Sequence, residues 1–104
     1  MKKNDDKIRG VAKIIMLAKN EDEVIGILHD LFTKSEIEKA HERVKIFACL
    51  KDGKSQRETK KESHAAIATV SHGAKFLKNS AVIIRQVIET AQNMEWWRSL
   101  FWRS

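Results

Sequence analysis

Apolar residues recur at intervals of three and four along most of this chain, which is the spacing of one face of an α-helix. Such stripes predict helices over residues 7–19, 21–32, 33–53, 65–79 and 81–91. No segment alternates apolar and polar positions as a half-buried strand does, and proline is absent from all 104 residues. The pattern therefore predicts an all-α fold, with about six helices once a short polar one is added.

Polar residues mark where two of these helices begin. Thr33 and Glu36 have the spacing of a capping box, and Ser55 and Glu58 repeat it. The first pair opens a long helix that ends at Gly53, as helices commonly end at glycine. The second pair opens a short polar helix that can run only to about residue 62.

The short polar helix and the next helix follow each other with only Ser63 and His64 between them. Residues 55–78 therefore have the outline of a helix-turn-helix. Small side chains at the start of the second helix would let it approach base edges in the major groove, while the first helix offers basic residues to the phosphates. The alternative is a helical hairpin that packs and does nothing more.

Charge is unevenly distributed along the chain, whose formal net charge is +6. Residues 51–79 hold seven Lys or Arg against three acids, whereas residues 21–38 hold one Lys against six acids. A basic block at the predicted helix-turn-helix favours a polyanion partner such as double-stranded DNA. A solvated basic surface without a partner has the same composition, so charge by itself leaves both interpretations open.

Length and composition limit the number of domains and the classes of protein that remain possible. The chain is expected to be a single domain, residues 1–104, with no signal peptide and no membrane span. A lone cysteine, Cys49, excludes an internal disulfide and fits a reducing, cytoplasmic setting. No HExxH or CxxC spacing and no Ser or Cys set with a histidine and an acid is present, so neither a metal site nor an enzyme is predicted.

Three strings carry a resemblance to a known family. SQRE at residues 55–58, AAIAT at 65–69 and LFTKSEIEKAHERVKI at 31–46 resemble the Trp repressor family, over about residues 30–90. The resemblance implies an intertwined homodimer. Each copy presents one reading head, the helix-turn-helix of residues 55–78, whose second helix is the reading helix. The resemblance also implies a repressor of tryptophan biosynthesis operators, with L-tryptophan as the small-molecule effector, a corepressor that sets the spacing of the two heads.

The resemblance assigns two kinds of DNA contact to the predicted helix-turn-helix. Base contacts, direct or through water, would fall on Arg57, Ile67, Ala68 and Ser71. Phosphate contacts would fall on Gln56, Lys60, Thr69 and Lys78.

A tryptophan pocket is implied at five positions: Thr33, Arg43, His72, Gly73 and Phe76. Arg43 and His72 stand where the family holds the indole between two arginines, and histidine lacks the bidentate grip of arginine on a carboxylate. Gly73 keeps space for the ligand, whereas Phe76 and Phe47 replace smaller residues and could fill it. Two interpretations stay open: the pocket still binds tryptophan, or the protein binds DNA without sensing it. Arg43 would in the second case form a surface or dimer salt bridge.

The turn and the tail also depart from the family. Thr59 and Ser63 replace leucines and His64 replaces a glycine, so the first short helix is predicted to be loosely attached. Either the head orders only on DNA, or it has drifted and binds poorly. The aromatic tail, residues 94–104, leaves four outcomes open: docking on the body, docking on a partner subunit, docking on a membrane surface, or disorder. A helical protein- or membrane-interaction module is the remaining alternative function.

Overall fold

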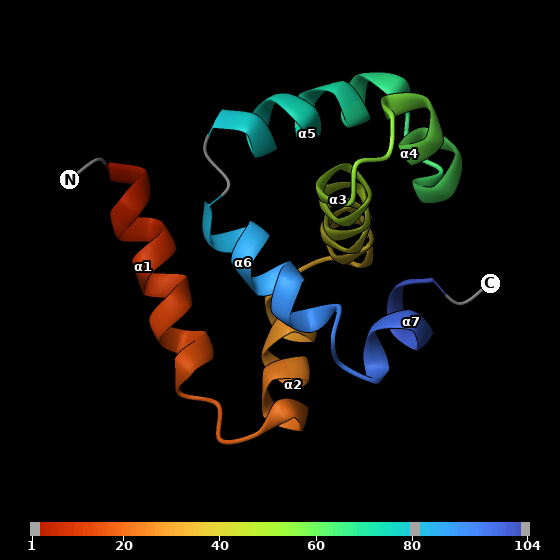
Figure 1. Cartoon of the computed structure of the whole chain (residues 1–104). Coiled ribbons are helices and arrows are strands. Elements are labelled where there is room, and N and C mark those ends of the chain that lie inside the picture. Colours follow the sequence, from red (N-terminus) through yellow and green to blue (C-terminus); the bar gives the residue numbers. More distant parts are fainter. Residues whose placement is uncertain (1–2, 80–81, 103–104) are drawn as a thin grey trace. The chain divides into compact units, whose positions relative to one another are not determined.

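The computed structural model (Figure 1) describes residues 3–79 and 82–102, which divide into two compact units, residues 1–37 and 38–104. The described residues form helices and no strand, which confirms the predicted all-α class. The helices are α1 (Lys3–Met16), α2 (Glu21–Leu31), α3 (Lys34–Lys51), α4 (Gln56–Ser63), α5 (Ile67–Asn79), α6 (Val82–Ala91) and α7 (Trp96–Phe101). The seventh arises because the aromatic tail forms a helix of its own; its residues 103–104 lie outside the described part.

The first unit holds two amphipathic helices with little buried surface. Asn20 caps α2, because its Oδ1 accepts a hydrogen bond from the Glu23 amide at 3.0 Å. No residue of α2 is buried, and Ile8 and Leu17 are 65% and 76% exposed. The described chain therefore leaves apolar faces of this unit in contact with solvent.

Both predicted capping boxes are present. The Thr33 hydroxyl accepts a hydrogen bond from the Glu36 amide at 3.1 Å, and the Thr33 amide donates to the Glu36 carboxylate at 2.9 Å. Gly53 ends α3 as predicted, with φ at 88°. Its amide bonds the carbonyl of Leu50, and the amide of Lys54 bonds that of Cys49, which is the Schellman arrangement.

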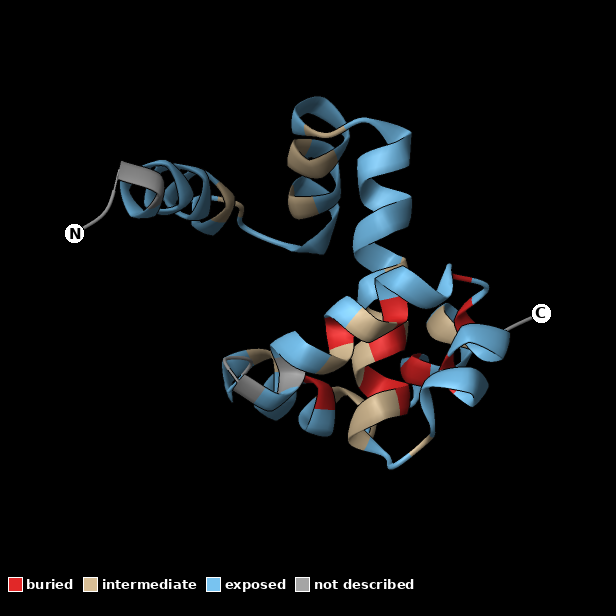
Figure 2. Cartoon of the chain, turned by 90° about the horizontal axis from the view of Figure 1, so that it is seen from above, coloured by how far each residue is buried: buried red, intermediate tan, exposed pale blue. Residues whose placement is uncertain are grey.

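The core of the second unit lies along α3, where it forms two clusters (Figure 2). In one cluster, Ile46 packs with Ala65 and Val70 on the side of the helix-turn-helix. In the other, Ala48, Ile88 and Trp97 bring α3, α6 and α7 together. The long helix is thus the element on which the reading head and the tail are both mounted.

The tail docks on the body of its own chain, one of the places predicted for it. Trp97 is 5% exposed, and Phe101 stacks on the ring of His41 with 4.4 Å between centroids. The His41 Nε2 lies 2.7 Å from the carbonyl oxygen of Leu100. Trp96 stays 44% exposed, so only part of the aromatic surface of the tail is used in this docking.

Candidate nucleic-acid interface

The first helix of the reading head, α4, begins at a complete capping box. The Ser55 hydroxyl accepts a hydrogen bond from the Glu58 amide at 3.1 Å, and the Ser55 amide donates to the Glu58 carboxylate, also at 3.1 Å. These bonds from the backbone and side chain of Ser55 lower the pKa of Glu58. The box fixes where α4 starts and leaves its remaining N-terminal amides pointing outward, which is the side an anion approaches.

The turn between α4 and α5 depends on one unusual residue. His64 has φ at 61° and ψ at 17°, the left-handed conformation that favours glycine, and it has the only positive φ among the described non-glycine residues. Its amide donates to the Lys60 carbonyl at 2.9 Å, which closes α4. The next residue, Ala65, is then buried against α3. The turn thus has the geometry that the sequence predicted would be costly for a histidine.

The two polar replacements in the reading head lie inside it. Thr59 is 0% exposed and Ser63 is 5% exposed, and Val70 of α5 is also fully buried. The Ser63 hydroxyl accepts a hydrogen bond from the Ala65 amide at 3.3 Å. The Thr59 Oγ1 is buried and has no hydrogen-bond partner in the described part of the chain. Both replacements are therefore buried, and the unpaired Thr59 hydroxyl adds a cost that a leucine side chain would not have.

The residues expected to face DNA are accessible on α4 and α5. Seven of the eight are exposed: Gln56, Arg57, Lys60, Ile67, Ala68, Thr69 and Lys78. The eighth, Ser71, is half-buried because its hydroxyl donates a hydrogen bond of 2.7 Å to the Gln56 Oε1. This bond ties the N-terminus of the first helix to the first turns of the second.

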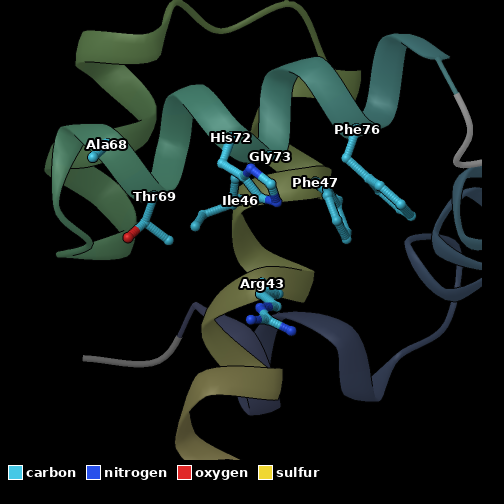
Figure 3. A pocket seen from close by; sticks show the side chains of 8 residues that line it. All are labelled: Arg43, Ile46, Phe47, Ala68, Thr69, His72, Gly73 and Phe76. Atoms are coloured by element: carbon cyan, nitrogen blue, oxygen red, sulfur yellow. The ribbon is translucent and has the colours of Figure 1, made fainter.

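A hollow of about 510 Å³ lies beside the reading helix (Figure 3). Its lining comes from α3 and α5: Arg43, Ile46, Phe47, Ala68, Thr69, His72, Gly73 and Phe76. Four of the five residues expected to hold a ligand are among them. The fifth, Thr33, belongs to the first unit, where its hydroxyl caps α3.

The hollow has two chemically different sides. Figure 3 shows Phe47 and Phe76 beside each other at one side and Ala68 with Thr69 at the other. The two phenyl rings stack with their centroids 5.8 Å apart. Arg43 on α3 and His72 on α5, both exposed, provide the basic groups of the lining. Such a cavity suits a flat apolar molecule that carries an anionic group.

Gly73 has a packing role that the sequence did not predict. A Cβ at this position would lie 2.9 Å from the Cγ2 of Ile46, which is 1% exposed. The absence of a side chain at Gly73 therefore lets Ile46 of α3 approach closely, and it also leaves room on the side that faces the hollow. Ile46 was not among the five positions predicted for the pocket, although its position three residues after Arg43 puts both on one side of the helix.

Other candidate chemistry in the described residues is sparse. Burial raises the pKa of the Cys49 thiol, which is 1% exposed. Within residues 3–79 and 82–102, no group of three His, Cys, Asp or Glu side chains is placed to hold a metal ion. Over the same residues, no helix combines the length and apolarity needed to cross a membrane.

Comparison with known proteins decides the family. Residues 6–92 match the family model described as Trp repressor protein. The chain belongs to the Trp repressor family. This family comprises helix-turn-helix DNA-binding transcriptional regulators, and α4 and α5 are the two consecutive helices where the sequence predicted this motif. The match begins in α1 and ends directly after α6, which leaves α7 outside it. No solved structure matches the chain.

Proposed function

We propose that this Trp repressor family member is a homodimeric repressor that binds operator DNA of tryptophan biosynthesis genes with L-tryptophan as corepressor. The observation that carries the proposal is the double position of Ala68 and Thr69. Both lie among the exposed residues expected to face DNA, and both line the hollow beside α5. A ligand in the hollow therefore touches the same turn of helix that approaches the duplex.

The link between ligand and DNA in this proposal is the spacing of α3 and α5, because both helices line the hollow. A ligand that bridges Arg43 on α3 and His72 on α5 favours one spacing of the two helices. The ligand shifts the protein toward the DNA-binding arrangement only to the extent that its affinity for that arrangement exceeds its affinity for the other one. The close approach of Gly73 to Ile46 limits how near the two helices can come.

Dimerisation is supported by apolar surface that each unit leaves exposed. Met16 of α1 is 81% exposed, and Val82, Ile83 and Val87 of α6 are 66%, 77% and 55% exposed. A small soluble domain rarely exposes so many large apolar side chains unless a partner covers them. A second copy of the chain is the simplest partner, and two copies present two reading heads to a palindromic site.

The test is duplex binding by the purified chain. Anisotropy of a labelled palindromic operator is measured at about 50 mM and about 200 mM salt, each with and without L-tryptophan. We expect a dimer by light scattering, an affinity that falls steeply with salt, and tighter binding with tryptophan. A monomer that ignores the duplex at low salt would overturn the proposal.

A second candidate function is DNA binding without tryptophan sensing. The stacked rings of Phe47 and Phe76 favour it, because they occupy one side of the hollow. Calorimetry separates the two: heat on adding L-tryptophan supports a corepressor, and none at millimolar concentration supports the second candidate. His72→Arg, which restores a bidentate donor to the lining, is expected to strengthen any binding of the carboxylate.

A further inference from the structure

The residue that follows α7, Trp102, contacts two ammonium groups at once. The Lys45 Nζ lies 5.0 Å from the centre of its ring, and the Lys54 Nζ lies 5.7 Å away. Both distances are within the range of a cation–π interaction. Lys45 belongs to α3, but Lys54 lies in the loop that leads into α4. The tail, which lies outside the family match, thus reaches the entrance of the reading head.

Lys54 is held at both its ends. Its amide donates to the Cys49 carbonyl at 3.0 Å, which anchors the backbone to the last turn of α3. Its Nζ lies 2.7 Å from the Glu62 Oε2, near the C-terminus of α4. This hydrogen bond to Glu62 raises the pKa of Lys54, so the ammonium that meets the indole stays charged. One side chain therefore joins the tail, the long helix and the first helix of the reading head.

The connection through Lys54 spans an open space between α4 and the tail. A hollow of about 640 Å³ is lined by Asp52, Lys54, Glu62, Gln92, Trp97, Arg98 and Trp102. Apolar packing does not fill this space. The two sides are connected instead by Lys54, through its ion pair with Glu62 and its cation–π contact with Trp102. Two residues that line the hollow are bonded to each other: the Gln92 side-chain amide, just after α6, donates a hydrogen bond of 2.9 Å to the Asp52 carboxylate, just after α3.

We infer that Lys54 is a positioning residue of the reading head, through which the docked tail sets the orientation of α4. Trp102 holds the ammonium from one side, and Glu62 receives it on the other. Since α4 and α5 are in contact and the Ser71 hydroxyl bonds the Gln56 Oε1, fixing α4 also restrains α5. The inference rests on the proposed function for its DNA-binding consequence, and on contacts within the chain for the placement of α4.

The first experiment measures operator affinity of the dimer. Trp102→Leu and Glu62→Gln each remove one weak contact of Lys54, and Lys54→Met removes both, so each variant is expected to weaken binding by about threefold or more. Lys54→Arg keeps the contacts with both Trp102 and Glu62, so its affinity for the operator is expected to equal that of the parent. Trp96→Leu is the matched control, because Trp96 belongs to the same tail, at the start of α7, and is 44% exposed. Parental affinity in all three weakening variants would overturn the inference.

Glu62→Gln separates positioning from simple electrostatics. Removing a carboxylate from a DNA-binding protein strengthens binding if only the long-range charge matters. Positioning predicts the opposite, a weaker complex. It also predicts that Trp102→Leu combined with Glu62→Gln is no more than slightly worse than either alone, since both act through Lys54. Tighter binding by Glu62→Gln, or full additivity of the two changes, would contradict positioning.

A second readout needs no DNA. Amide hydrogen exchange within α4 is expected to speed up in Trp102→Leu, while exchange within α1 stays unchanged. Unchanged α4 exchange would overturn the positioning role directly. A parent chain that ignores duplex DNA, with α4 still loosened in Trp102→Leu, would overturn the proposed function and support the placement of α4 by the tail.

Discussion

The α-carbon of Gly73 faces the Cγ2 of Ile46 so closely that an added methyl group would lie 2.9 Å from it. Ile46 is 1% exposed, packs with Ala65 and Val70, and borders the hollow on its remaining side. The distance between α3 and the reading helix is therefore set by a glycine against an isoleucine. The spacing matters for function, because the hollow proposed to hold the effector opens between the same two helices.

Gly73→Ala is expected to destabilise the protein by about 1–3 kcal/mol, because the new methyl would overpack the buried, β-branched side chain of Ile46. Thermal or urea unfolding measures the change. Gly10→Ala is the control: within the described part of the chain, only the surrounding helix itself comes near the position of its Cβ. It is expected to stabilise α1 by about 0.5–1 kcal/mol. Equal effects of the two changes would show that the close contact at Gly73 is not tight.

Thr59→Val is expected to stabilise the reading head by about 1 kcal/mol, because it replaces an unpaired buried hydroxyl with a methyl of similar shape. Ser63→Ala is the matched control, since the Ser63 hydroxyl does accept a hydrogen bond from the Ala65 amide. It is expected to destabilise by about 1 kcal/mol. Urea unfolding of both variants measures the signs; a destabilising Thr59→Val would mean that the hydroxyl has a partner.

His64→Gly is expected to stabilise the protein by about 1 kcal/mol, because glycine adopts the left-handed conformation of the turn without a Cβ penalty. The same replacement at His72, inside α5, has the opposite expected sign, since glycine in a helix interior costs about 1 kcal/mol. Unfolding midpoints of the two variants, without ligand, give the comparison. A loss of stability in His64→Gly would show that the imidazole contributes contacts of its own.

Acid is expected to weaken the cap of α4. Because the folded pKa of Glu58 is lowered from 4.5, its contribution is fully present above that pH. The contribution is lost as pH falls from 4.5 through the lower folded value. Glu58→Gln lacks this titration, so the stability difference between parent and variant should shrink in this range of pH. A difference that does not depend on pH would contradict a charged cap.

Lys60→Ala is expected to weaken binding to every duplex and to reduce the slope of log affinity against log salt by about 1, as the loss of one phosphate contact does. Ala68→Asp is expected to abolish binding, because it adds a negative charge where the reading helix approaches the bases. Lys39→Ala, an exposed lysine on α3, is the control. If Lys60→Ala and Ala68→Asp both bind like the parent, the DNA-facing side of the head is assigned wrongly.

The two capping boxes are features of the fold that could be predicted from short stretches of sequence. Thr33 with Glu36, and Ser55 with Glu58, fix helix starts through bonds between residues three apart, so the strings alone predicted them. Gly53 ended α3 for the same reason. The positions matched to the family were also readable from the chain, and four of the five ligand positions do line one hollow.

The docking of the tail and the role of Gly73 could not be predicted in this way. The sequence offered the tail three surfaces, and only the placement of Trp97 against Ala48 and Ile88 chose one. Similarly, Lys54 and Trp102 stand far apart in sequence and show no spacing that would relate them.

The sequence by itself determined most of the helices, their caps and the basic, small-sided helix pair proposed to read DNA, because each depends on interactions within a few residues. Only the tertiary structure decided which side chains fill the hollow, that a glycine sets the spacing of α3 and α5, and that the tail reaches Lys54. Those features depend on distances between segments remote in the chain, and such distances follow from how all the apolar faces pack together.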